Sequence, residues 1–397
     1  MHLKEKLHHF WFRFKVTLSH WFWLRWSLIS LREIQKVARI IPEFEVKAHL
    51  YITWKTWSGK SSLTLIWIYW QWWKSRKKND RNLIVIDPHW SMVELLRKTK
   101  LAKKYSDQLI YIDPALSKNH TPTINPLECR DKNPADIEIK ANQLVIAIQE
   151  LIPDAKLSNY MKAILKPCLF VLLSKKTATL EDLQEFLWED NQFRLEQGKK
   201  SKVKAYRDFF RNEFMNPIYL RTKQSIYTKI QSLLNSQIFY DFTIWVSTLD
   251  LAREVRQGKV ILFNLSKGKL SEEVAGTIGR FIIAQLKSIA LKRASLPPHL
   301  WKPIYLVIDE VDAFCRWDTL NIILKETRKM GLHLRVISQN IVSWKWYEKL
   351  KRNLINNTNV KIIWANGLAT LKALSNGKRT TKHILPRQSS CSTLVQK

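Results

Sequence analysis

Glycine is scarce in this chain of 397 residues. There are nine glycines, where a chain of this length usually has about 7%. Tryptophan, ordinarily one of the rarest residues, occurs 18 times, and the two residue types together number 27. That sum is close to the usual glycine content alone, so the shortage of one residue matches the excess of the other.

Acidic residues and paired cysteines are also few. The chain has 34 Asp and Glu against 66 Lys and Arg, a formal charge of +32, which excludes an acidic or neutral housekeeping protein. Its four cysteines are scattered without a CxxC pair or a histidine at ligand spacing, so a disulfide framework and a structural zinc site are not expected. A reducing compartment is the default.

Long hydrophobic runs are missing as well. The nearest candidate, residues 17–31, is interrupted by His20 and Arg25, and a membrane-spanning helix needs roughly 18 apolar residues. The basic and aromatic opening residues lack the apolar core and cleavage site of a signal peptide. With 46% hydrophobic and 25% charged residues, the chain has the composition of a globular protein rather than a disordered one.

What the sequence does contain is an alternation of short β-branched runs and helical stretches. Strands are predicted within 48–53, 82–87, 108–114, 259–266, 303–310 and 332–340, with helices from about 63 to 73, 92 to 101, 271 to 293 and 319 to 330. This order predicts an α/β fold with a mostly parallel central sheet flanked by helices.

One stretch breaks the alternation. Between about Asp136 and Phe242 the spacing is helical with almost no strand signal, which predicts an inserted all-helical subdomain. The predicted organisation is a basic N-terminal extension (1–44), a first part of the α/β domain (45–135), the helical insertion (136–245), a second α/β part (246–365) and a polar tail (366–397).

The segment after the first strand resembles a phosphate-binding loop, G-x-x-x-x-G-K-[ST]. That loop needs glycines because successive backbone N–H groups curl around phosphates, while its Lys reaches the β and γ oxygens and its hydroxyl binds Mg²⁺. The candidate nucleotide-binding residues are Trp54, Lys55, Thr56, Trp57, Ser58, Gly59, Lys60, Ser61 and Ser62. Trp54 stands where the first glycine belongs, so the loop as written is expected to be impaired.

Reading Trp54 and Trp57 as glycine turns WKTWSGKSS into GKTGSGKSS, a complete loop. The same reading of Trp90 gives IDPHG, with glycine at a strand-to-helix turn, and it removes the aromatic run Trp67, Trp70, Trp72 and Trp73. We interpret many of the tryptophans, and in the widest form all of them, as a stop codon that the source organism reads as glycine. The alternative is genuine tryptophan serving as base-stacking platforms or a membrane-interface belt.

A second motif supplies carboxylates. The apolar run PIYLVI ends in Asp309 and Glu310, which suits an aspartate that binds Mg²⁺ and a glutamate that acts as general base. Gln339 lies near the end of the next predicted strand and is the candidate γ-phosphate sensor, and Arg328 is the candidate arginine finger for a neighbouring subunit. The simpler alternatives are an acidic turn, a solvated strand end and a solvated helix end.

Together the segments GKS, IDPHW, NLSKG, LVIDE, ETRKMGLHL and ISQN resemble the HerA/FtsK superfamily of RecA-like motor ATPases over about residues 45–365. More narrowly, they are similar to the ATPases and coupling proteins of type IV secretion and conjugative DNA transfer. The resemblance implies a RecA-like P-loop fold and a homo-hexameric ring with nucleotide at the subunit interfaces. It places Lys60 and Ser61 on phosphate and Mg²⁺, and Asp309 with Glu310 in the Walker B role.

The expected cofactors are ATP and Mg²⁺, and the charge of +32 favours DNA as partner because it suits salt-sensitive contacts with a polyphosphate. Candidate contact regions are the basic clusters at 74–78, 198–204 and 349–352, although such clusters are also common on solvated faces. Basic charge equally suits an anionic membrane surface or a secretion channel, so a cytoplasmic location, or one peripheral to the inner face of the membrane, is expected. The rival functions are a secretion ATPase that moves protein and a non-enzymatic binding protein with a degenerate loop.

Overall fold

The computed structural model describes residues 49–54, 60–75, 77–116, 119–129, 132–149, 158–188, 191–311, 317–338, 348–364 and 394–395. Its strands are β1 (His49–Trp54), β2 (Asn82–Asp87), β3 (Leu109–Ile112), β4 (Val260–Asn264), β5 (Ile304–Ile308), β6 (Leu332–Ser338), β7 (Thr358–Trp364) and β8 (Leu394–Val395). They form one sheet in the order β3-β4-β2-β5-β6-β1-β7-β8. Every pairing is parallel except that of β7 with β8, so the predicted mostly parallel sheet is confirmed.

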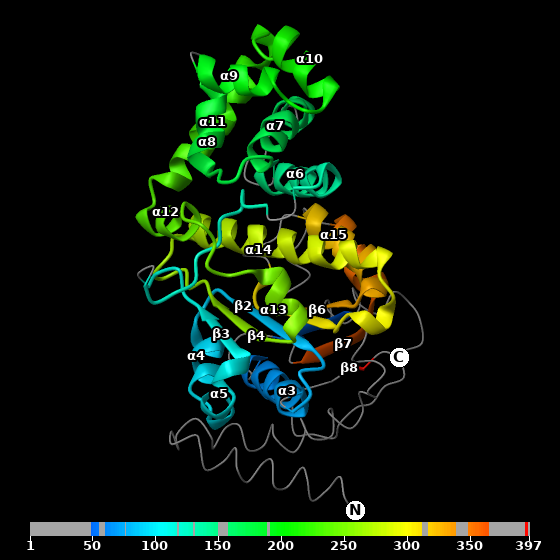
Figure 1. The fold of residues 1–397 in the computed structure, drawn as a ribbon. Coiled ribbons are helices and arrows are strands. Elements are labelled where there is room, and N and C mark those ends of the chain that lie inside the picture. The colour runs from blue at the N-terminus through cyan, green and yellow to red at the C-terminus, as the bar shows by residue number, and fades with distance from the viewer. Residues whose placement is uncertain are drawn as a thin grey trace, which may run out of the picture.

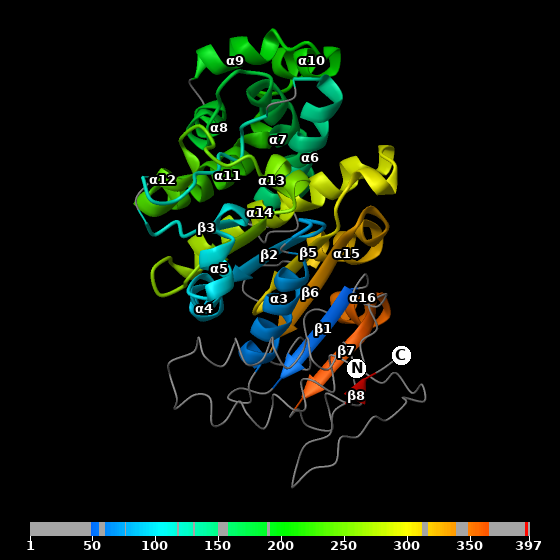
Figure 2. The same ribbon diagram turned by 60° about the horizontal axis from the view of Figure 1, so that its bottom comes forward.

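Helices cover both faces of this sheet (Figures 1 and 2). The helices of the α/β part are α3 (Lys60–Ser75), α4 (Ser91–Arg97), α5 (Lys100–Lys104), α13 (Leu251–Gln257), α14 (Glu272–Lys292), α15 (Trp317–Glu326) and α16 (Glu348–Asn357). In Figure 1, α3, α4 and α5 lie below the sheet, and α13, α14 and α15 lie above it. The predicted alternation of strands and helices is confirmed.

Alternate side chains of the strands point to the two covered faces. In β2, Leu83 and Val85 join the apolar cluster that contains Trp72 of α3, whereas Ile84 and Ile86 join the cluster on the α14 side. Both sets are fully buried, which explains why the run contains no polar alternation. A sheet with two covered faces leaves its strand ends as the places where polar groups can gather.

The helical stretch predicted between the third and fourth strands is present. It contains α6 (Pro134–Gln149), α7 (Ser158–Leu173), α8 (Leu180–Leu187), α9 (Gln192–Lys199), α10 (Lys204–Asn212), α11 (Leu220–Leu234) and α12 (Gln237–Thr243). Helices α6 to α11 stand away from the sheet at the top of Figure 1, and α12 lies lower, beside α14, where Phe239 packs against Phe281. A further helix, α13, follows them. Asp250 caps its start, and Gly258 ends it with a left-handed φ of 83°.

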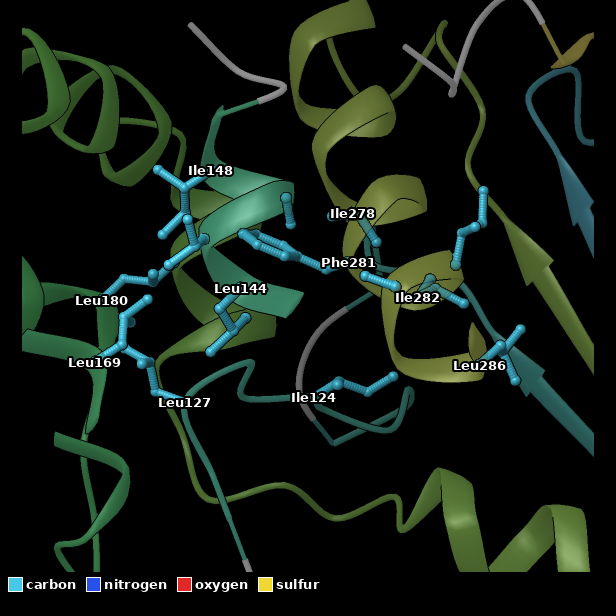
Figure 3. Close-up of a cluster of buried hydrophobic side chains, with 14 of the residues drawn as sticks. Ile124, Leu127, Leu144, Ile148, Leu169, Leu180, Ile278, Phe281, Ile282 and Leu286 are labelled. Atoms are coloured by element: carbon cyan, nitrogen blue, oxygen red, sulfur yellow. The ribbon is translucent and has the colours of Figure 1, made fainter. Parts of the chain in front are cut away.

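The helical part is joined to the sheet through α14. Figure 3 shows Leu144 and Ile148 of α6 on one side of an apolar cluster and Phe281 and Ile282 of α14 on the other. By length and composition α14 resembles a membrane span, but 72% of its apolar window is buried inside the protein. It is therefore the central core helix between the two parts of the molecule.

Candidate nucleotide site

The candidate nucleotide site lies at the carboxyl edge of the sheet, where the predicted motifs come together. Tyr51 of β1 and Ile308 of β5 both pair with Val336 of β6, so the two outer strands are level with each other. They are separated by two strand spacings, about 10 Å. The end of β1 and the acidic pair after β5 therefore lie at the same edge, on either side of β6.

The predicted phosphate loop connects β1 to α3. Trp54 is the last residue of β1 and Lys60 is the first residue of α3, followed by Ser61 and Ser62 in its first turn. Residues 55–59, including Lys55, Thr56, Trp57, Ser58 and Gly59, lie outside the described residues. The strand, connection and helix thus follow the predicted order, and a 16-residue helix with no acidic residue in its first turn presents its N-terminus, which favours anions, at this edge.

Asp309 and Glu310 come directly after β5. The Asp309 backbone N–H donates to the carbonyl of Ile86 in β2 at 3.1 Å, which continues the sheet pairing, and its side chain is buried. The Glu310 backbone N–H donates to Asp309 Oδ1 at 3.1 Å. Glu310 itself has a left-handed φ of 46°, so the chain turns sharply directly after Asp309.

Two further residues of this edge, Asp87 and His89, were not predicted. Asp87 ends β2 and is fully buried; its carboxylate accepts N–H groups from His89 (2.8 Å), Met92 (2.8 Å) and Val93 (3.1 Å). It therefore fixes the turn between β2 and α4 by occupying orphan donors of that helix. The available signal was an aspartate directly after a buried apolar strand.

His89 contacts the predicted general base. Its Nε2 lies 2.5 Å from Glu310 Oε2, and the contact raises the pKa of His89 above its ordinary value. We call the four residues Asp87, His89, Asp309 and Glu310 the acidic cluster. They come from two neighbouring strands and meet only through the sheet, because 221 positions separate His89 from Glu310 in the chain.

The electrostatics of the acidic cluster favour a cation. Burial raises the pKa of Asp87, and the negative charge of Asp309 acts in the same direction. Among the described residues no three His, Cys, Asp or Glu side chains already form a metal centre. Mg²⁺ does not need one, because it usually keeps several waters and takes only one or two carboxylates together with substrate phosphates. Buried Asp309 beside Asp87 fits that requirement.

The two remaining candidates are Gln339 and Arg328. Gln339 lies outside the described residues; β6 ends at Ser338, whose Oγ is 2.6 Å from the hydroxyl of Tyr51. Arg328 is exposed in a 3₁₀ turn (Thr327–Met330) that precedes the start of β6, at the opposite edge of the sheet. Within one chain it does not approach Glu310, so only a role toward a neighbouring subunit is compatible with its position.

The tryptophans interpreted as glycine occupy different environments. Trp90 has a left-handed φ of 60°, a conformation that favours glycine, and its side chain is 53% exposed without capping α4. Trp72 is completely buried against the sheet, which favours an indole, although its Nε1 has no hydrogen-bond partner. The backbone therefore supports the glycine interpretation most directly at position 90.

The three basic clusters lie on separate elements. Residues 74–75 end α3 and 77–78 come shortly after it, 198–204 run from the end of α9 to the start of α10, and 349–352 are within α16. Of these residues, Lys77, Lys78, Lys200, Lys202, Lys204 and Arg352 are exposed. The basic residues are thus distributed over both the helical part and the α/β part.

The known proteins that this chain resembles come from conjugation and type IV secretion. A family model described as the TraM recognition site of TraD and TraG matches residues 303–392, a stretch that begins with β5 and the acidic pair. No curated protein matches the chain. The solved structure of the plasmid coupling protein TrwB with the ATP analogue ADPNP has a TM-score of 0.55 and 15% identity, covering 81% of this chain and 71% of that one.

A second solved structure, VirB4 of Thermoanaerobacter pseudethanolicus, has a TM-score of 0.54 and 14% identity, with 88% of this chain and 89% of that chain covered. At such identities the likeness establishes the fold. The chain has a RecA-like P-loop fold with a mostly parallel sheet, as predicted. Its resemblance is to the coupling proteins and ATPases of conjugation and type IV secretion.

Proposed function

We propose that this chain is an ATP-hydrolysing motor that moves DNA, in the manner of a conjugation or type IV secretion coupling ATPase. The observation that carries the proposal is the common sheet edge. Lys60 begins α3 after β1, and Glu310 follows β5, two strands away. In the proposed site the triphosphate lies across this gap of roughly two strand spacings, about 10 Å.

In the proposed reaction, Lys60 and the backbone of residues 54–59 bind the β- and γ-phosphates. Mg²⁺, held by Ser61 and Asp309, would neutralise charge on the phosphate oxygens. Glu310 accepts a proton from water while the water oxygen bonds to the γ-phosphorus. The bond from that phosphorus to the bridging oxygen breaks, releasing ADP and phosphate. Gln339, next to Ser338 at the end of β6, would orient the γ-phosphate or the water.

The comparisons support ATP and Mg²⁺ as ligands. TrwB structures are described in complex with the ATP analogue ADPNP and in complex with ADP and Mg²⁺. TrwB is also described as a plasmid coupling protein, which supports DNA as the cargo. The charge of +32 and the exposed lysines and arginines on several elements agree with a salt-sensitive grip on DNA phosphates.

Assembly belongs to the same proposal. A homo-hexamer would bring exposed Arg328 of one subunit to the nucleotide of the next, which one chain alone does not do. The similarity to a TraM recognition site supports a partner protein at the DNA-processing complex. We place the motor in the cytoplasm, or peripheral to the inner face of the membrane beside a secretion channel.

A second candidate function is a secretion ATPase that moves protein rather than DNA, which the likeness to VirB4 favours. The two candidates differ in one property. A DNA motor is expected to hydrolyse ATP faster when DNA is present, whereas a protein-moving ATPase is expected to be indifferent to DNA. A non-enzymatic binding protein with a degenerate loop would bind no nucleotide.

One assay separates the three. ATP turnover is measured with and without DNA for the full chain as written and for the full chain with glycine at positions 54, 57 and 90. We expect DNA-stimulated turnover at least in the glycine form. Glu310→Gln should lower kcat about 100-fold or more while ATP binding persists, and Lys60→Ala should weaken ATP binding itself. Glu94→Gln, a carboxylate of α4 outside the cluster, is the control.

Two outcomes would overturn the proposal. Turnover that is identical with and without DNA would favour the protein-moving ATPase. Failure of both forms to bind ATP would leave a binding protein without motor activity. Mass spectrometry of residue 54 in native protein tests the recoding interpretation separately, since genuine tryptophan there would contradict it.

A further inference from the structure

A cavity of about 340 Å³ lies between the helical part and the α/β part, and none of the acidic cluster lines it. That volume is in the range of small-molecule sites. The walls come from α6, from α14 with α13, and from the two chain segments that cross between the parts. Figure 3 shows three of the lining side chains, Ile124, Leu144 and Phe281, which come from three different walls.

The two crossing segments form a wall that is fixed by hydrogen bonds. The Asn125 N–H donates to Ser247 Oγ at 2.9 Å, and the Ser247 N–H donates to the Glu128 carboxylate at 2.7 Å. Asn125 Nδ2 also donates to the carbonyl of Ala178 in the helical part at 2.7 Å. These bonds tie both crossings to each other and to the helical part, so this wall does not depend on exposed side chains.

The opposite walls, on α6 and α14, carry polar groups that the protein does not use. Gln143 of α6 is only 8% exposed, yet its amide has no partner within the described part of the chain. Gln285 and Ser288 of α14 are half-buried and likewise lack a side-chain partner among the described residues. Because buried amides are nearly always hydrogen-bonded, these groups point to a ligand that enters the cavity.

The charges that line the cavity favour an anion. The lining cations are Lys140, Lys292 and Arg256, from α6, α14 and α13. The lining carboxylates are Glu128 and Asp250, and each of them already accepts a backbone N–H. Arg256 is exposed and has no side-chain partner among the residues that the structure describes. Positive charge is therefore in excess on these walls.

Lys140 is the least exposed of the three cations. Its ammonium donates to the carbonyl of Glu128, which uses one of its three N–H donors. Burial lowers the pKa of Lys140 to about 8, and the charges of Lys292 and Lys132 act in the same direction. A negative charge beside the ammonium would favour its charged form and oppose this effect of burial.

We propose that this cavity is a binding site for a small organic anion, a metabolite that carries a phosphate or a carboxylate. Its acidic group would accept hydrogen bonds from the Lys140 ammonium and the Gln143 amide, with Arg256 adding charge on the exposed side. Because the walls come from both parts of the molecule, an occupant would hold the helical part against α14. The site goes beyond the proposed motor function and does not depend on ATP hydrolysis.

The test is labelling of the full chain with pyridoxal 5′-phosphate, a phosphate-bearing aldehyde. Its carbonyl carbon forms an imine with a neutral lysine amine, and the carbonyl oxygen leaves as water. Borohydride reduces the imine, and peptide mass spectrometry locates the label. Pyridoxal, which lacks the phosphate, is the matched probe. We expect the ratio of the two labelling rates to be about tenfold larger at Lys140 than at exposed Lys162 of α7, as for one charge-assisted hydrogen bond.

Two variants separate anion binding from the reactivity of the lysine. Gln143→Leu removes the amide while nearly keeping the side-chain volume, and Arg256→Gln removes a charge from an exposed position where folding is not at risk. Both should bring the ratio at Lys140 toward that at Lys162, while labelling by pyridoxal is retained. Arg221→Gln, at an exposed position of α11 outside the cavity, is the matched control.

Competitors identify the acidic group. Inorganic phosphate and citrate are added in separate arms, and protection of Lys140 by one of them assigns a phosphate-bearing or a carboxylate-bearing ligand. Equal ratios at Lys140 and Lys162 in the parent would overturn the anion site, as would protection by neither competitor. The labelling is repeated in Lys60→Ala, where the ratio at Lys140 should be unchanged. Failure of the parent to bind ATP would therefore count against the proposed function alone.

Discussion

Two groups of polar side chains lie at the carboxyl edge of the same sheet, and they are built differently. The acidic cluster lies on β2 and β5. A second group, which we call the edge network, lies beside it on α4, β3, β4 and the segments after these strands: Glu94, Arg97, Tyr111, Asp113, Asn264 and Lys269. Comparing them shows how differently two groups of polar side chains can be charged at one sheet edge.

The carboxylates of the edge network are paired with donors and cations of the same network. The Tyr111 hydroxyl donates to Glu94 at 2.6 Å, Asn264 Nδ2 donates to Asp113 at 2.9 Å, and Lys269 pairs with Asp113 at 3.0 Å. Although burial opposes it, hydrogen bonds from Arg97 and Tyr111 hold the pKa of Glu94 below its ordinary value. Each carboxylate here has a cation of its own.

The acidic cluster is arranged differently. The His89 ring contacts Glu310, and burial raises the pKa of Asp87, whereas the pKa of Glu94 is lowered. Excess negative charge at a strand end is costly unless a further cation shares the site. The two groups therefore differ in their electrostatics although they share one edge.

The largest effect on stability is expected from Asp87. Replacing it with alanine leaves the N–H groups of His89, Met92 and Val93 without their acceptor, which should lower the free energy of unfolding by about 3 kcal/mol. Asp87→Asn keeps an acceptor oxygen and should lose less. Urea denaturation measures both, and an alanine variant within 0.5 kcal/mol of the parent would contradict this account.

The edge network should respond to mutation with smaller changes in stability and none in chemistry. Glu94→Gln removes the acceptor charge for Arg97 and Tyr111, and we expect a loss of about 1 kcal/mol in unfolding free energy. ATP turnover should stay within a factor of two of the parent. If Glu94→Gln reduced turnover as strongly as Glu310→Gln, the proposal that only the acidic cluster takes part in ATP hydrolysis would be contradicted.

Trp90, which directly follows His89 of the acidic cluster, allows a further test. Trp90→Gly should raise the free energy of unfolding by about 1 kcal/mol, because glycine adopts a φ of 60° without the steric cost of a side chain. Trp188 is similarly exposed but has a φ of −71° and contacts Tyr227, so Trp188→Gly should be destabilising. Equal effects of the two substitutions would count against backbone strain at position 90.

The smallest effect is on pH dependence, where the two groups have opposite signs. The folded-state pKa of Glu94 is lowered, so its stabilisation is present above its ordinary pKa of 4.5 and is lost as the pH falls through the folded value. The folded-state pKa of Asp87 is raised above 3.8, so ionising it on going to higher pH costs stability. Between pH 7 and 4, Glu94→Gln should lose less stability than the parent and Asp87→Asn should lose more.

Much of the fold was predictable because each signal was local. The apolar runs that end in Asp87 and Ile308 are strands, and a parallel sheet covered on both faces explains why they show no polar alternation. The common edge of the acidic pair and Lys60 followed from the rule that polar ends of parallel strands meet. The short pairing of Leu394–Val395 with β7 was not predicted, because the surrounding tail is polar.

The candidate site was predicted only in part. Asp309 and Glu310 carry a recognisable pattern, whereas the role of Asp87 depends on hydrogen bonds to backbone groups and the contact of His89 depends on which strands are neighbours. Sequence order cannot show that β2 and β5 are adjacent when more than 200 residues separate them. Arg328 followed a family pattern, and its position at the opposite edge required the sheet topology.

The start of α14 is tied to the turn that carries His89. The N–H of Leu265 donates to the carbonyl of Asp87 at 2.9 Å, and the N–H of Lys267 donates to that of Pro88 at 3.0 Å, a few residues before α14 begins. From there the helix extends about 31 Å beneath the helical part, packed against α6. A displacement of the helical part would therefore be transmitted along α14 to the backbone beside His89.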